Sequence, residues 1–150
     1  MIHYRSTVRG SGIAARSVKR TAEALLEALD EKGSALSLSL VNDAQIRKLN
    51  RIHRGKDRPT DVLSFPLAAP DARPGEGERL LGDVVISVDT ARRQAAEYDA
   101  TLEAELNRLL IHGVLHVMGH DHEEPGERER MRAEERRLAA AIGLPWPYED

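Results

Sequence analysis

The sequence predicts an α+β fold, in which helices pack on a small mixed sheet of about four strands, as a single domain over residues 1–150. Strand-like and helix-like patterns alternate in the first half of the chain, and only helical patterns follow the last strand. The length fits one domain of common size. A composition of 41% hydrophobic and 31% charged residues is typical of globular proteins.

The first half alternates strands and helices. The expected elements are a strand over 2–5, a helix over 13–29, a strand over 35–40 and a short helix capped by Asn42 or Asp43 and ending at Leu49. Apolar residues recur every three or four positions in the first helix, as on a half-buried amphipathic helix. "ALSLSL" alternates apolar and small polar residues, which favours a strand with one buried face.

The second half begins with two strands and ends with three helices. The expected elements are strands over 59–66 and 80–88, then helices over 89–97, 101–118 and 127–142. Prolines bracket "PTDVLSFP", and β-branched residues dominate "LLGDVVISV". Between them, "LAAPDARPGEGER" is rich in glycine and proline and predicts a surface loop.

The composition restricts the chemistry. The chain has no cysteine, so metal binding must use histidines and carboxylates. No stretch approaches the roughly 20 apolar residues of a membrane span, and the amino terminus lacks a secretory pattern. We therefore expect a cytoplasmic protein with no membrane partner.

The charges are unevenly distributed. Residues 1–60 hold twelve Lys and Arg against six Asp and Glu, whereas residues 61–150 hold ten against nineteen. The densest basic run is "RKLNRIHRGKDR", with six cations and one carboxylate. Such a run is either a solvated face or a surface for an anionic partner.

Four of the six histidines lie in "HGVLHVMGHDH". His112 and His116 are four residues apart, so a helix places both on one face. Gly119 can end that helix in the left-handed conformation, which allows the chain to return His122 to the same ion. The spacing therefore predicts one Zn²⁺ per chain, bound by three imidazoles with water in the fourth position. We do not expect His120 to be a ligand.

The histidine spacing is that of the metzincin proteases, in which the residue after the first histidine is the glutamate general base. Here that residue is Gly113, which cannot accept a proton. Peptide hydrolysis is therefore disfavoured. A zinc ion that lowers the pKa of its water to about 7 suits a phosphodiester better, because the protein then needs chiefly to neutralise phosphoryl charge.

Neutralising that charge requires cations near the metal. The segment "HRGKDRPTDVLSFP" supplies three, Arg54, Lys56 and Arg58. We favour Arg54, because its planar fork can bind two phosphate oxygens and Gly55 allows close backbone approach. The alternative is a structural ion pair from Arg54 to Asp57 or Asp61.

Three motifs together resemble the YbeY family, bacterial endoribonucleases that cleave single-stranded RNA and mature ribosomal RNA. They are "LNRIHRGKDRPTDVLSFP" at 49–66, "LLGDVVIS" at 80–87 and "HGVLHVMGHDH" at 112–122. The resemblance covers most of residues 35–142. It implies zinc on His112, His116 and His122 and a functional arginine at Arg54.

The resemblance also implies a biological setting. It suggests 3′-end maturation of 16S rRNA in the small ribosomal subunit and ribosome quality control, with a small-subunit ribosomal protein and the GTPase Era as partners. Two other functions remain open. One is a ribosome-assembly or RNA-binding module in which zinc is only structural and nothing is catalysed, and the other is a metallopeptidase. The general base is not assigned, and Asp121 can instead orient a ligand histidine.

Overall fold

The computed structural model describes residues 1–67, 79–121 and 123–146. The elements, in chain order, are β1 (Ile2–Ser6), α1 (Ala15–Ala28), β2 (Ser34–Val41), α2 (Asp43–Arg54), β3 (Val62–Pro66), β4 (Arg79–Ser87), α3 (Val88–Glu97), α4 (Leu102–Val117) and α5 (Pro125–Ala141). This order confirms the predicted α+β class and the predicted succession of strands and helices. The predicted loop at 67–79 lies almost entirely outside the described residues.

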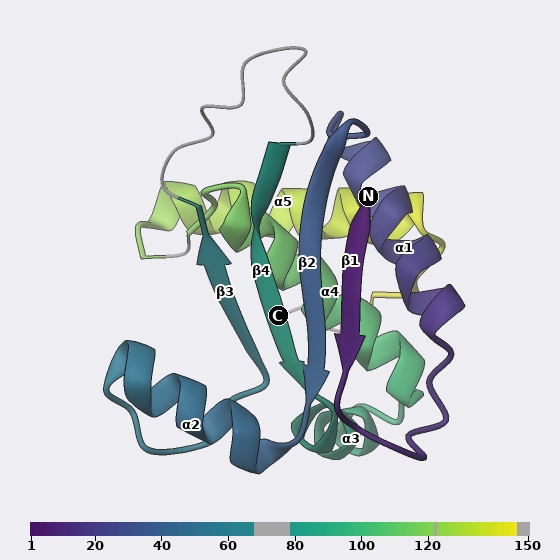
Figure 1. Ribbon diagram of the computed structural model, residues 1–150. Coiled ribbons are helices and arrows are strands. Elements are labelled where there is room, and N and C mark those ends of the chain that lie inside the picture. Colours follow the sequence, from purple (N-terminus) through teal and green to yellow (C-terminus); the bar gives the residue numbers. More distant parts are fainter. Residues whose placement is uncertain (68–78, 122, 147–150) are drawn as a thin grey trace.

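The four strands form one mixed sheet in the order β1-β2-β4-β3 (Figure 1). Strands β1, β2 and β4 run parallel, whereas β3 pairs with β4 in the antiparallel direction. Strand β3 is therefore an edge strand, and its outer side is available to side chains from neighbouring elements.

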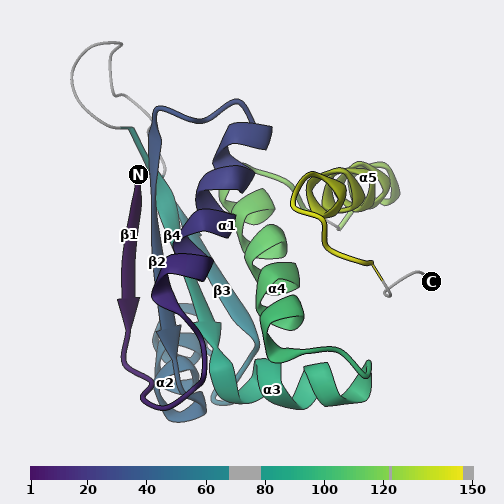
Figure 2. The ribbon, with the colours of Figure 1, turned by 90° about the vertical axis from the view of Figure 1, so that its right-hand side faces the viewer.

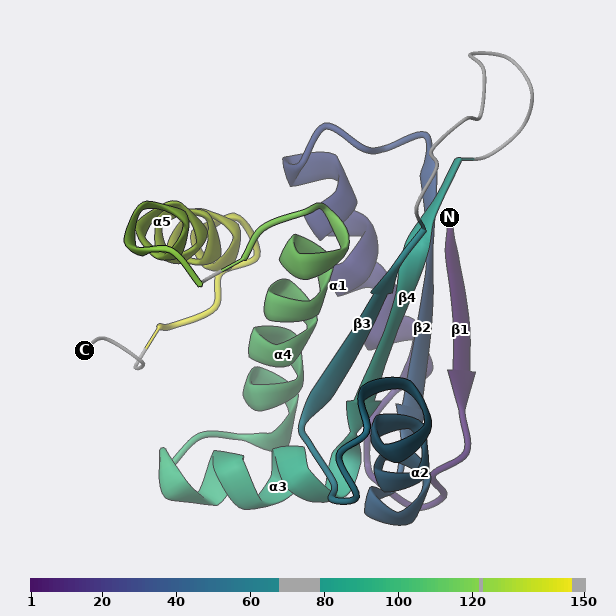
Figure 3. The ribbon, with the colours of Figure 1, turned by 90° about the vertical axis from the view of Figure 1, so that its left-hand side faces the viewer.

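Helices α1 and α4 cover one face of the sheet, and α5 packs outside them (Figure 2). The main core lies between this helix layer and the sheet. Its fully buried side chains include Leu25 of α1, Leu38 of β2 and Leu110 of α4. Helix α2 lies on the opposite face (Figure 3), where Ile46 packs on Val85 in a second, smaller cluster.

Four predicted boundaries differ from the structure by two residues or more. The helix expected from residue 13 begins at Ala15. The helix expected to end at Leu49 continues to Arg54, because Asn42 and Gln45 form a capping box at its start and Gly55 ends it at φ +69°. The strand expected from residue 59 begins at Val62, and the last helix begins at Pro125 rather than at residue 127. Proline suits the first helical turn because an N–H at this position has no partner within the helix, so its absence costs no hydrogen bond.

Candidate metal centre and active site

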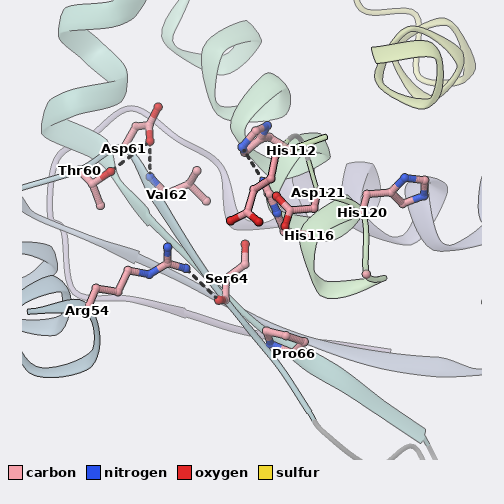
Figure 4. Close-up of a pocket in the computed structure, with 12 residues that line it drawn as sticks. Arg54, Thr60, Asp61, Val62, Ser64, Pro66, His112, His116, His120 and Asp121 are labelled. Atoms are coloured by element: carbon pink, nitrogen blue, oxygen red, sulfur yellow. Dashed lines mark hydrogen bonds between the residues drawn. The ribbon is translucent and has the colours of Figure 1, made fainter. Parts of the chain in front are cut away.

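Two predicted metal ligands meet at the carboxyl end of α4. This helix is buried along most of its length, and His112 and His116 lie on the side that borders a hollow. Their Nε2 atoms are 3.1 Å apart, and their ring centroids are 4.5 Å apart (Figure 4). The four-residue spacing therefore directs both imidazoles to one point.

The end of α4 has the predicted geometry. Gly119 has a φ of +98°, its N–H donates to the carbonyl of His116, and the N–H of His120 donates to the carbonyl of Leu115. These two hydrogen bonds form a Schellman motif, which reverses the chain after the helix. Figure 4 shows the His120 ring directed away from His112 and His116. His122, the third predicted ligand, lies outside the described residues.

The histidine pair has the geometry of a partial metal site. Two nitrogens on one tetrahedral zinc ion, each at about 2.0 to 2.1 Å, lie about 3.3 Å apart. The observed 3.1 Å fits that separation, although one imidazole N–H donating to the other nitrogen fits it as well. Among residues 1–67, 79–121 and 123–146, no group of three or more potential ligands is assembled. The pair thus offers two nitrogens to an ion, and a complete metal site would need a further ligand.

Gly113 lies in close contact with the sheet. A Cβ atom at this position would lie 2.6 Å from Cγ1 of Val84 and 3.2 Å from Cγ2 of Val62. In addition, the Ser64 hydroxyl donates to the carbonyl of Gly113 at 3.1 Å. The contact leaves no room for the glutamate that metzincins have here, so packing explains the glycine.

Arg54 approaches the same hollow from the other face of the sheet. It is the last residue of α2, and its Nη2 donates to the carbonyl of Ser64 on the edge strand at 3.5 Å. In Figure 4, Ser64 lies between Arg54 and the two histidines. The ion pair considered as an alternative is not formed: Asp57 binds Arg47 at 2.9 Å, and Asp61 accepts from the backbone of Val62.

Lys56 and Arg58 are exposed on the segment between α2 and β3. The buried amide of Asn50 donates to the carbonyl of Arg58 at 2.9 Å, which holds this segment against α2. The hydrogen bond from Arg47 lowers the pKa of Asp57. Neither Lys56 nor Arg58 lines the hollow, so the structure brings only Arg54 of the three cations to the histidines.

The hollow between these groups has a volume of about 630 Å³. It is lined by Arg54, Thr60, Asp61, Val62, Ser64, Pro66, His112, His116, Gly119, His120, Asp121 and Glu123. The side chains of Asp61, Ser64 and Glu123 were not singled out from the sequence as site residues. Two of them belong to the "TDVLSFP" part of the first motif, which could have indicated their position.

Comparison with known proteins identifies the family. A family model described as "Endoribonuclease YbeY" matches residues 6–143. The chain belongs to this family. Proteins named endoribonuclease YbeY from Myxococcus xanthus and Halorhodospira halophila are 53% and 41% identical to it, over 87% and 93% of the chain. The chain spans 44% of the Myxococcus protein and 92% of the Halorhodospira protein.

A solved structure supports the YbeY-type fold. The solution structure of TM1509 from Thermotoga maritima matches with a TM-score of 0.61 and 27% identity, covering 100% of this chain and 97% of that one. Within the described ranges, no helix has the length and hydrophobicity needed to cross a bilayer.

Proposed function

We propose that this protein is a metal-dependent endoribonuclease that cleaves single-stranded RNA during ribosomal RNA processing, including maturation of the 3′ end of 16S rRNA. The observation that carries the proposal is the arrangement of His112 and His116 opposite Arg54 across one hollow. Membership of the YbeY family supports the same activity.

We propose Zn²⁺, one per chain, as the ion, with His122 as the third ligand beside His112 and His116. The chemistry of the donor set supports this choice, because imidazoles suit zinc and the chain has no thiolate to offer. When bound, such an ion activates water and polarises a phosphoryl oxygen. The packing of Gly113 against the sheet argues against a peptidase with a glutamate base at that position.

Arg54 has the chemistry of a phosphate-binding residue. Its Nη2 makes one long hydrogen bond to a carbonyl, so the other donors of the guanidinium can bind phosphoryl oxygens. Positive charge placed at the reacting phosphate stabilises the transition state more than the ground state. Lys56 and Arg58, two and four residues after Arg54 and outside the hollow, would contact more distant phosphates of the RNA.

The partners proposed for the protein follow from the family resemblance. They are the small ribosomal subunit, a small-subunit ribosomal protein and the GTPase Era, with a role in ribosome quality control in the cytoplasm. A pull-down with purified small subunits in the presence and absence of Era tests this part separately from catalysis.

Metal analysis and an RNA cleavage assay test the proposal together. The protein should contain about one zinc ion per chain and should cleave single-stranded RNA, and a chelator should abolish cleavage that added Zn²⁺ restores. Zinc-loaded protein that binds RNA in a salt-sensitive way without cutting it would instead favour an RNA-binding module. Cleavage of a peptide library would revive the metallopeptidase.

A further inference from the structure

One carboxylate interrupts the buried side of α5. Met131, Leu138 and Ala139 are buried on this helix, and Glu135 lies four residues after the first and three before the second. Residues at these spacings share one helix face. Glu135 therefore points toward the interior, and its side chain is only 14% exposed. A largely buried carboxylate costs folding free energy unless a positively charged or polar group lies beside it.

The partner is a predicted metal ligand. Oε2 of Glu135 lies 3.9 Å from Nδ1 of His112, a close electrostatic contact that is longer than a hydrogen bond. The contact joins two helices that cross near the end of α4 (Figure 2). The nitrogen that faces His116 is Nε2, so Glu135 meets the ring on its other side.

The two ring nitrogens of His112 thus have different surroundings. A carboxylate near Nδ1 favours the tautomer with the proton on Nδ1, which leaves the lone pair of Nε2 available to a metal. A carboxylate that accepts the ring N–H of a ligand histidine fixes both the tautomer and the ring orientation, and a small rotation of the Glu135 side chain would bring Oε2 from 3.9 Å to hydrogen-bond distance. The neighbouring Glu134 differs, because Arg137 binds it and lowers its pKa.

We propose that Glu135 is a positioning residue for the metal site: it holds His112 in the orientation and tautomer that present Nε2 to the ion. This inference rests on the proposed function, since it takes His112 as a ligand. It adds a residue from α5, a helix outside all three sequence motifs, and it gives that helix a role in metal affinity.

Two substitutions separate this role from simple packing. Glu135→Met keeps the length of the side chain, completes the apolar stripe and removes a largely desolvated carboxylate, so the metal-free protein should be as stable as the parent or more stable. Its zinc affinity, measured by competition with a chromophoric chelator, should nevertheless fall roughly 10- to 100-fold. Glu135→Asp keeps the charge and should lose less affinity than Glu135→Met.

A matched control lies one residue earlier. Glu134→Met removes a carboxylate from the same helix turn but not from His112, so it should leave zinc affinity unchanged. In a His112→Ala background, Glu135→Met should have no further effect on affinity, because the residue acts through the missing ring. Nitrogen NMR of the metal-free protein should show His112 protonated on Nδ1 in the parent and redistributed toward Nε2 in Glu135→Met.

The outcomes distinguish the inference from the function on which it rests. If the parent binds zinc no more tightly than His116→Ala does, the proposed metal site itself fails. If the parent binds tightly and Glu135→Met binds equally tightly with an unchanged His112 tautomer, Glu135 is only a packing residue and the inference is overturned while the proposed function stands.

Discussion

The two walls of the hollow differ in how they are held. One wall, here called the histidine wall, is formed by His112 and His116 of α4. This helix is buried between the sheet, α3 and α5. The other, the arginine wall, is formed by Arg54 at the exposed end of α2. Its side chain reaches the edge strand β3 through a long hydrogen bond to the carbonyl of Ser64. The histidine wall is fixed by packing over most of the length of α4, whereas the end of α2 that carries Arg54 is held by a helix cap and a few polar contacts.

This difference matches the role proposed for each wall. Metal ligands must keep distances to within a few tenths of an ångström, which packed helices can ensure. A side chain that binds a flexible phosphate backbone tolerates more movement, and an exposed position lets RNA reach it. We therefore expect substitutions on the histidine wall to alter metal binding, and those on the arginine wall to alter RNA chemistry alone.

The largest expected effect is that of His116→Ala on the histidine wall. The variant should lose tight zinc binding and RNA cleavage together, because one of the three proposed ligands is gone. Metal content by mass spectrometry and a single-stranded RNA cleavage assay measure both losses. Retention of a full zinc equivalent in this variant would place the ion elsewhere.

Arg54→Glu tests the other wall. The variant should keep its zinc and its thermal stability but cleave RNA roughly 100-fold more slowly, the order of magnitude for losing one charge-stabilising donor. Arg51→Glu makes the same charge change one turn earlier on α2, outside the hollow, and should have a much smaller effect. Equal losses in the two variants would mean that general electrostatics, and not the position of Arg54, governs the rate.

The two walls also differ in how well the sequence predicted them. Periodicity and spacing identified α4 and its histidine pair, because both depend on residues close together in the chain. The full length of α2 was missed because the residues after Leu49 bury only the polar Asn50, so no buried apolar residue marks the last turn before Gly55. The antiparallel edge position of β3, the approach of Arg54 to Ser64, and the contact between Glu135 and His112 all depend on pairings distant in sequence, which local patterns do not encode.

Gly113→Ala probes how tightly the histidine wall is packed. The added methyl would overlap Val84, a buried and β-branched neighbour with little freedom to move. Overpacking of this kind costs about 1–3 kcal/mol, and the better helix propensity of alanine returns up to about 1 kcal/mol. We expect a lower melting temperature in thermal denaturation followed by circular dichroism.

Gly126→Ala is the control for Gly113→Ala, because it is also a glycine in a helix. A Cβ at Gly126 would lie 3.6 Å from the end of the flexible Arg130 side chain. This substitution should therefore raise stability by about 0.5 kcal/mol through reduced unfolded-state entropy. If both variants were destabilised equally, the close contact of α4 with the sheet would not be the cause.

The smallest effects should come from Lys56→Ala and Arg58→Ala, the cations outside the hollow. Each should weaken RNA binding similarly for all sequences and reduce the slope of log affinity against log salt by about 1 per cation, while the cleavage rate at saturating RNA stays near that of the parent. Fluorescence anisotropy at several salt concentrations measures the slope. An unchanged slope in the double variant would show that the bound RNA does not pass over Lys56 and Arg58.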